Sequence, residues 1–285
     1  MKVVVTGKDG QLASEFYNLK STDKNWKFVS INDLDISDRD STLDFFKDYK
    51  TDLIINCAAY TAVDKAEENI NLAYNVNYLG VKNLLEACLF NNSKFIHFST
   101  DYVFDGESKI AYTENDIANP KTIYGKSKLK GEIEIKKSSI KSIILRTSWV
   151  YSCYGNNFVK TMLKISNNTN QISVIYDQIG SPTYAKDLAN ATLTIIANNE
   201  YKWGVGDIFN FSNNGECSWY EFAKEIFKIQ KMPIIVNKIK TKDYETLAKR
   251  PEYSLLNKDK FEKTFNTKIN PWNISLKNML KKLNL

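Results

Sequence analysis

Short apolar runs alternate with longer stretches of periodic apolar residues through roughly the first half of the chain. A continuous apolar run is typical of a strand buried on both faces, whereas apolar residues at every third or fourth position are typical of an amphipathic helix. The runs predict strands at 3–6, 26–31, 52–56, 95–98 and 143–145. The periodic stretches predict helices at 11–19, through 76–88 and at 124–135, and another after Ser37–Asp40, which is similar to a capping box.

The order of these elements predicts the fold class. Strands that are apolar on both faces need helices on both sides, so we expect an α/β fold with a doubly wound parallel sheet. We divide the chain into a sheet domain, residues 1–148, and a smaller C-terminal lobe, residues 149–285, with a strand near 207–212 returning to the main sheet. Within the lobe the pattern predicts short strands at 172–175 and 234–236 and helices at 219–229 and 275–283.

Composition and charge narrow the function classes. The chain has 285 residues and a formal net charge of +6, but its lysines are interspersed with acidic residues. Without a concentrated basic stripe we expect no nucleic-acid partner. The single histidine, His97, cannot build a histidine-based metal cluster, so we interpret it as structural and predict no metal site.

Cysteine spacing and the early sequence bear on the compartment. The four cysteines lie far apart without CxxC spacing, which favours a reducing compartment without disulfides or zinc. A glycine comes too early for a signal peptide, and no apolar run approaches the roughly 20 residues that span a bilayer. We expect a soluble cytoplasmic protein without a membrane partner.

A glycine turn follows the first predicted strand. Gly7 and Gly10 open a GxxGxxA pattern that ends at Ala13. The first glycine permits a tight turn, the second lets the backbone approach a pyrophosphate, and the following helix presents free N–H groups. The pattern predicts that residues 1–148 form a dinucleotide-binding Rossmann domain, with an ordinary turn as the alternative. Asp33, near the end of the second strand, leaves the preference between NADPH and NADH open because its orientation toward the ribose is not predictable.

Tyr124 and Lys128 lie four residues apart on a predicted helix, downstream of Thr100, which closes a strand. This spacing places a phenol and an ammonium on one helix face. A nearby positive charge stabilises phenolate, so we expect the pKa of Tyr124 to move from about 10 towards neutral pH. Such a phenol can donate the proton that a carbonyl needs during reduction. The alternative is a chance pair on a solvated helix face.

Several motifs occur in a family-specific order. Segments 99–106, 124–128 and 146–151 together resemble the extended short-chain dehydrogenase/reductase superfamily, and more narrowly the dTDP-4-dehydrorhamnose reductases. Segments 58–67, 177–183, 250–251 and 254–255 are similar to the narrower family. The resemblance covers essentially the whole chain.

The resemblance implies a reaction. Tyr124 would donate a proton to the C4 carbonyl oxygen of dTDP-4-dehydro-L-rhamnose while NADPH or NADH delivers a hydride to that carbon. Lys128 would hold the cofactor ribose and lower the pKa of Tyr124, and Thr100 would hydrogen-bond the reacting oxygen. The product would be dTDP-L-rhamnose, a precursor of cell-surface polysaccharide.

The resemblance also implies further site residues. Substrate-binding residues would be Thr100, Asp101 and Trp149. Cofactor-binding residues would be Gly7, Gly10, Gln11, Leu12, Asp35, Ile36, Ala58, Ala59, Tyr60, Thr61, Tyr124 and Lys128. A Mg²⁺ ion is compatible with the family but is not readable from the sequence, and the protein is expected to be a monomer or a homodimer.

Two positions depart from related patterns. The family commonly has glycine where this chain has Ala13, and related nucleotide-sugar dehydratases have a glutamate where this chain has Tyr102. The second difference favours reduction over elimination. Two alternatives stay open: a reductase or epimerase of another nucleoside-diphosphate sugar, and a non-catalytic, reductase-like regulatory subunit.

Overall fold

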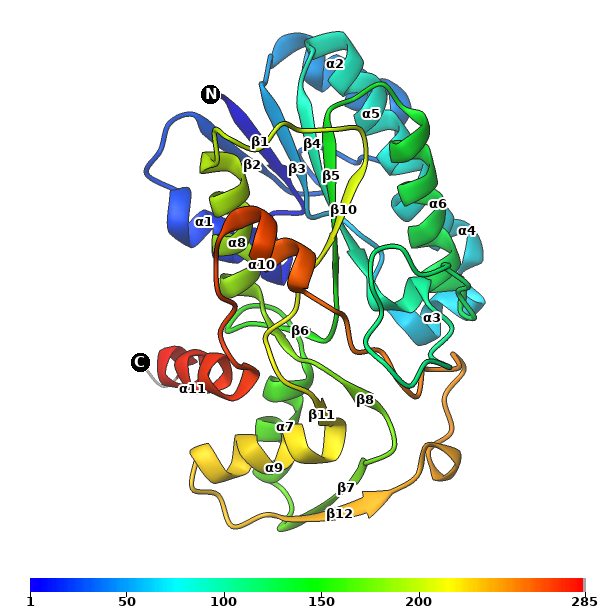
Figure 1. Ribbon diagram of the computed structural model, residues 1–285, viewed down its shortest axis with the longest axis vertical. Helices are drawn as coiled ribbons and strands as arrows, with labels where there is room; N and C mark the ends of the chain where they lie inside the picture. Colours follow the sequence, from blue (N-terminus) through cyan, green and yellow to red (C-terminus); the bar gives the residue numbers. More distant parts are fainter. Residues whose placement is uncertain (284–285) are drawn as a thin grey trace.

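A six-stranded parallel sheet forms the centre of the computed structural model, which describes residues 1–283 (Figure 1). The predicted doubly wound α/β fold is confirmed, and so is the returning strand, which pairs with the fifth predicted strand. The strands, in their order across the sheet, are β10 (Asp207–Asn210), β5 (Ser142–Thr147), β4 (Lys94–Thr100), β3 (Leu53–Asn56), β1 (Val3–Thr6) and β2 (Trp26–Val29).

Alternate residues of each strand supply two separate cores. Val5, Ile55 and Leu145 face one layer of helices, whereas their neighbours, such as Val4 and Ile54, face the other. Apolar area is therefore removed from water on both faces. This burial stabilises the fold by roughly 25 cal/mol per Å² of apolar surface. The first layer contains α1 (Gln11–Lys20), α8 (Ala185–Ala197) and α10 (Asp259–Phe265), and the second contains α2 (Arg39–Asp48), α5 (Gly80–Asn91) and α6 (Ile123–Lys137) (Figure 1).

A smaller lobe lies beyond the carboxyl ends of the strands (Figure 1). Its own apolar core is built around α9 (Trp219–Ile229), which begins with a capping box between Ser218 and Glu221. Because α8, α10 and β10 follow residue 149 and yet cover or extend the main sheet, the lobe is not one continuous segment. Its other elements are β6 (Val150–Tyr151), α7 (Phe158–Ser166), β7 (Gln171–Ile175), β8 (Ile179–Gly180), β9 (Thr183–Tyr184), β11 (Cys217–Ser218), β12 (Ile235–Ile239), η3 (Thr241–Asp243) and α11 (Trp272–Leu283).

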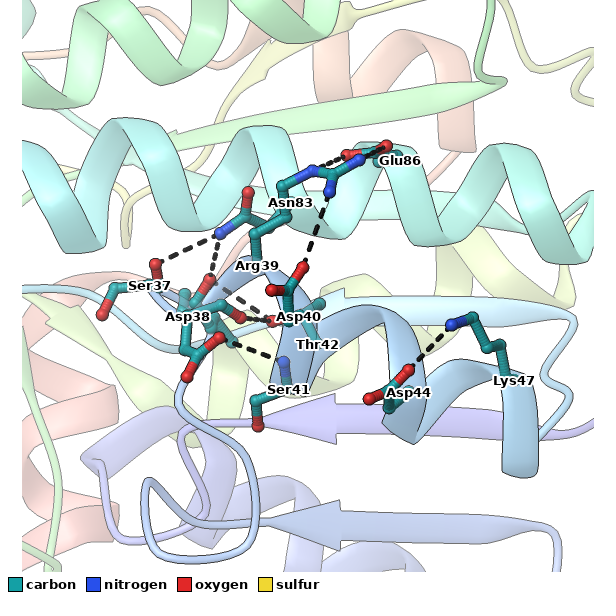
Figure 2. A network of polar contacts seen from close by, with 11 residues as sticks. Ser37, Asp38, Arg39, Asp40, Ser41, Thr42, Asp44, Lys47, Asn83 and Glu86 are labelled. Atoms are coloured by element: carbon teal, nitrogen blue, oxygen red, sulfur yellow. Dashed lines mark hydrogen bonds and ion pairs between the residues drawn. The ribbon is translucent and has the colours of Figure 1, made fainter.

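The predicted capping box at Ser37 is wrong by one residue. Asp38 caps α2, because its carboxylate accepts a hydrogen bond from the Ser41 N–H at 3.0 Å (Figure 2). Ser37 instead donates its N–H and hydroxyl to Asp35. Asn83 of α5 donates to the Ile36 and Ser37 carbonyls, so this network ties the start of α2 to α5.

Three further elements connect β3 to α5 and one follows β4. They are α3 (Val63–Glu68), α4 (Ile70–Tyr74), the π-turn η1 (Asn75–Leu79) and the 3₁₀ turn η2 (Asp101–Val103). The helix predicted through 76–88 thus starts in a short π-helix. Such wider helical turns often accompany a functional site. Among residues 1–283, no helix combines the length and apolarity needed to cross a bilayer.

Candidate active site

The turn after β1 requires glycine at its first position. Gly7 has a φ of 71°, and a β carbon there would lie 2.7 Å from the Ala58 backbone nitrogen. This confirms the predicted tight turn. Gly10 precedes α1 and has no side chain to cap it, so the N–H groups of the first helical turn are available to an anion. Ala13 is fully buried in the core beside β1 and allows the predicted close packing of helix on sheet.

One cavity of about 620 Å³ extends from this turn to the predicted catalytic residues. It lies at the carboxyl ends of the strands, where open α/β sheets bind ligands. Of the predicted site residues, it is lined by Gly10, Gln11, Leu12, Ala58, Ala59, Thr61, Thr100, Asp101, Tyr124, Lys128 and Trp149.

Four predicted cofactor residues, all of which the structure describes, do not line this cavity. They are Gly7, Asp35, Ile36 and Tyr60. Gly7 packs against the Cys57–Ala58 backbone, Asp35 accepts hydrogen bonds from Ser37, and Ile36 is buried against Gly80. The Tyr60 backbone is held by Asn77, which accepts from its N–H at 2.9 Å and donates to its carbonyl at 3.0 Å. Their cofactor contacts stay predictions.

The start of α6 positions Tyr124. The Thr122 hydroxyl caps the helix by accepting from the Gly125 N–H at 3.1 Å. Gly125 is required because a β carbon there would collide with the Tyr102 carbonyl oxygen. The close approach also brings the Tyr102 and Tyr124 rings into edge contact, with centroids 5.6 Å apart.

The expected lowering of the Tyr124 pKa is wrong in this structure. Burial raises the pKa of Tyr124 to about 12, opposed by a hydrogen bond with Thr100 and assisted by the charge of Asp101. Lys128 Nζ is directed to the Phe98 carbonyl oxygen, at 2.6 Å, and to His97 Nε2, at 3.1 Å. The phenol therefore holds its proton at neutral pH, as a proton donor must.

Burial also shifts the pKa values of two other groups at this end of the cavity, Lys128 and Asp101. It lowers the pKa of Lys128 to about 8, while Glu132 and Cys57 oppose the shift. It raises the pKa of Asp101 to about 6, against hydrogen bonds from Ser254 and Thr100. The Thr100 hydroxyl donates to Asp101 Oδ1 at 3.0 Å, so Thr100 lies between the carboxyl group and the phenol.

Trp149 enters the cavity with a left-handed backbone, at a φ of 48°. Such a conformation is strained for a bulky residue and often marks a functional site. Its ring stacks on Trp219, with centroids 3.6 Å apart. Gly180 leaves room for this ring, because a β carbon at that position would lie 2.8 Å from Trp149 Cε2.

Sequence reasoning missed Trp219 and a second cavity. Trp219, the first residue of α9, lines both cavities. The second has a volume of about 580 Å³, with Phe158, Met162 and Ile172 among its apolar walls and Arg250 as its cationic group. A tryptophan directly after a helix cap was the one available signal, because it had no evident part in the periodic core pattern.

An ion pair connects the second cavity to the main domain. Arg250 donates to both carboxylate oxygens of Asp64 on α3, and the Ala248 N–H donates to the same carboxylate. The hydrogen bond with Arg250 outweighs burial and lowers the pKa of Asp64. No group of three or more His, Cys, Asp or Glu residues suited to a metal occurs within residues 1–283.

The fold and the cleft define a class. A doubly wound sheet, a glycine turn after its first strand, and a tyrosine and lysine on one helix that share a cavity with that turn are typical of extended short-chain dehydrogenases/reductases. Comparison with known proteins narrows this class. The family model described as RmlD substrate binding domain matches residues 1–285.

Known reductases are similar to this chain over nearly their full length. The dTDP-4-dehydrorhamnose reductase of Aggregatibacter actinomycetemcomitans is 41% identical, and the alignment covers 98% of each chain. The crystal structure of a dTDP-4-dehydrorhamnose reductase from Clostridium acetobutylicum has a TM-score of 0.93 at 39% identity and covers 100% of both chains. That of Bacillus anthracis, in complex with NADP, has a TM-score of 0.93 at 36% identity and covers 99% of this chain and 100% of that chain.

This chain belongs to the dTDP-4-dehydrorhamnose reductase family and is an oxidoreductase. A dTDP-glucose 4,6-dehydratase from Streptomyces venezuelae, with a TM-score of 0.80 at 15% identity, shares the fold alone.

Proposed function

We propose that this chain reduces the C4 ketone of dTDP-4-dehydro-L-rhamnose to dTDP-L-rhamnose with NADPH or NADH. One observation carries the proposal: a single cavity joins the uncapped start of α1 to the buried Tyr124 hydroxyl group. A dinucleotide whose pyrophosphate is held at the start of α1 would reach towards Tyr124 along this cavity. The similarity to the full-length reductases supports the choice of substrate.

The cofactor end of the cavity is formed mainly by backbone and small side chains. N–H groups of the first turn of α1, at Gln11 and Leu12, suit a pyrophosphate. Ala58 and Ala59 let the rest of the dinucleotide pass close to the end of β3. Lys128, with its amine inside the cavity wall, is proposed to bind the nicotinamide ribose. The proposed cofactor set also keeps Gly7, Gly10, Asp35, Ile36, Tyr60, Thr61 and Tyr124.

The reacting end supplies the proton. When bound, the nicotinamide supplies a hydride to the C4 carbon of the sugar. Tyr124 then gives its phenolic proton to the C4 oxygen, and its burial keeps that proton in place until negative charge develops there. Thr100 and Asp101 lie beside the phenol and are proposed to orient the sugar oxygens.

The substrate spans the two cavities in this proposal. The sugar contacts Trp149, whose ring stacks on Trp219 at the boundary between them. The nucleoside diphosphate extends into the second cavity, where apolar walls suit a base and Arg250 supplies positive charge. We place the reaction in the cytoplasm and expect a monomer or homodimer.

The direct test follows nicotinamide absorbance with dTDP-, GDP- and UDP-linked 4-keto sugars. Each substrate is offered with NADPH and with NADH, with and without EDTA, which tests whether the reaction depends on a divalent ion such as Mg²⁺. Rapid oxidation of cofactor with the dTDP sugar supports the proposal. Preference for another base would indicate a different nucleotide-sugar reductase, and binding without turnover would indicate a regulatory subunit.

A further inference from the structure

Arg250 is the basic side chain in the wall of the second cavity. Its two terminal nitrogens donate to the two carboxylate oxygens of Asp64, which lies on α3 of the main domain. A guanidinium carries five N–H groups, and this pairing uses two of them. The Nε–H and one N–H on each terminal nitrogen remain, so the paired guanidinium still has donors for an anion.

The backbone on both sides of Arg250 has its own attachments to the main domain. Before it, the Ala248 N–H donates to Asp64 Oδ1 at 3.1 Å. After it, Pro251 packs closely on Gly106, because a β carbon at Gly106 would lie 2.4 Å from Pro251 Cβ. These contacts hold the segment without the guanidinium. What the ion pair adds is a fixed orientation of the Arg250 side chain.

The ion pair lies beside the boundary between the two cavities. Burial acts to lower the pKa of Arg250, but the hydrogen bond with Asp64 raises this pKa overall, and Tyr102 and Tyr244 add to the rise. Tyr102 lines the first cavity and Tyr244 lines the second. Since Tyr102 is also in edge contact with Tyr124, the guanidinium is one aromatic ring away from the catalytic phenol.

Helix α3 connects the ion pair to the rest of the site. Its first residue, Val63, lines the first cavity, and the next residue is Asp64. One turn further on, the Glu67 carboxylate accepts from the N–H of Ile123, the first residue of α6, at 2.9 Å. One short helix therefore supports both the guanidinium and the start of the helix that carries Tyr124.

We propose that Asp64 is a positioning residue for substrate binding: it holds the Arg250 guanidinium so that the remaining N–H groups meet the diphosphate of the sugar nucleotide. The inference rests on the proposed function, which supplies the identity of the anion. A planar guanidinium suits this task because it can bind a carboxylate along one edge and phosphate oxygens along another.

Asp64 has two opposing effects on an anion in the second cavity. Its negative charge repels the anion, whereas its hydrogen bonds keep Arg250 in place. The Asp64 side chain is 38% exposed and is paired with a cation, so water and the guanidinium both screen its charge. Without Asp64, the long Arg250 side chain would have to be immobilised when the ligand binds, which weakens binding. The orienting effect should therefore outweigh the repulsion.

The first test measures binding of dTDP and of thymidine to the full chain by titration calorimetry. Asp64→Asn keeps an acceptor for the Ala248 N–H but turns an amide donor toward Arg250. Its Kd for dTDP should rise about tenfold, while its Kd values for thymidine and for the cofactor should stay near the wild-type values. Glu68→Gln removes the same charge from an exposed position of α3 and should leave dTDP binding unchanged.

Three outcomes would overturn the positioning role. They are unchanged or tighter dTDP binding in Asp64→Asn, an equal loss for thymidine, and an equal change in Glu68→Gln, which would reduce the effect to the charge of α3. A wild-type protein that does not bind dTDP at all would instead overturn the proposed function, and this inference with it.

The second test asks whether Asp64 acts through Arg250. Arg250→Lys keeps the positive charge but loses the planar fork, so it should also raise the Kd for dTDP about tenfold. Adding Asp64→Asn to Arg250→Lys should change this Kd little further, because both changes remove the same oriented group. KM for the dTDP sugar should follow the Kd for dTDP, while kcat changes much less. Fully additive losses in the double variant, or a loss in kcat without a loss in dTDP affinity, would contradict the proposal.

Discussion

The two ends of the first cavity are built from different parts of the polypeptide. The cofactor end consists of a glycine turn, an uncapped helix start and small residues, so backbone atoms form most of it. The reacting end consists of hydrogen-bonded side chains, among them the buried Thr100 and Lys128 and the partly buried Tyr124. The cofactor end should therefore be sensitive to added bulk, and the reacting end to the loss of single atoms.

The largest effect is expected from removal of one oxygen at the reacting end. Tyr124→Phe should lower kcat by about 100-fold or more, because the proton donor is lost while the ring is kept. Cofactor Kd, measured by titration calorimetry, should stay near the wild-type value. Tyr112→Phe is the matched control, since it removes a phenol that bonds Asp105 and Ser108 outside this cavity. Near-normal turnover of Tyr124→Phe would remove the proposed acid from the mechanism.

One added methyl group at the cofactor end should weaken cofactor binding. Gly7→Ala places a β carbon against Ala58 and forces alanine into a left-handed backbone. We expect cofactor Kd to rise about tenfold, equivalent to about 1.4 kcal/mol. Gly215→Ala has the same left-handed backbone, with a φ of 90°, outside the cavity lining, and it should cost stability without weakening cofactor binding. Equal cofactor affinities in the two variants would contradict the proposal that the glycine turn at Gly7 binds the cofactor.

Trp149→Ala tests whether the sugar contact is separate from the cofactor contact. Loss of the stack on Trp219 removes about 0.5–1.5 kcal/mol of ring interaction. KM for the dTDP sugar should rise by about threefold to tenfold, and cofactor Kd should change little. Steady-state kinetics and cofactor titration together measure the two effects. An equal loss in both would indicate general destabilisation, which thermal unfolding would reveal.

The smallest effect concerns the pH dependence of stability. The pKa of Asp101 is raised to about 6 by burial, so the folded protein binds more protons than the unfolded chain between about pH 4 and 6. Its contribution is therefore full at low pH and is lost as the pH rises through about 6. Asp101→Asn should flatten this part of the Tm profile.

Asp105→Asn is a control of opposite sign. Slight burial acts to raise the pKa of Asp105, but hydrogen bonds from the Glu107 N–H and from the Tyr112 hydroxyl group lower this pKa overall. Its stabilising contribution is present above the ordinary carboxyl pKa and is lost as the pH falls. The same slope change in both variants would contradict the assignment at Asp101.

Local patterns were enough to predict the sheet and to select Thr100, Tyr124 and Lys128, which the structure brings together in one cavity. Apolar runs such as Leu53–Asn56 are strands because both faces are buried, and that property is visible in the sequence. The exact cap of α2 was not, since Ser37 and Asp38 are both good capping residues and Asp35 competes for Ser37. Helix spacing placed Lys128 near Tyr124 but could not predict that its amine turns to Phe98.

Contacts between distant segments lay outside the reach of sequence patterns. The stack of Trp149 on Trp219 joins the loop after β5 to the start of α9, which are far apart in the chain. Asn56 and Lys128, which contact the two ring nitrogens of His97, come from β3 and α6 and meet only in the folded protein. Periodicity describes how an element is buried; it does not describe which polar atoms meet across elements.

A crystal structure with oxidised nicotinamide cofactor and dTDP-L-rhamnose bound would test the central claim most directly. The account predicts that Tyr124 Oη lies within about 3 Å of the sugar O4 while the nicotinamide ring faces C4 from the other side. A phenol directed to solvent, or a sugar bound with C4 away from the nicotinamide, would contradict it.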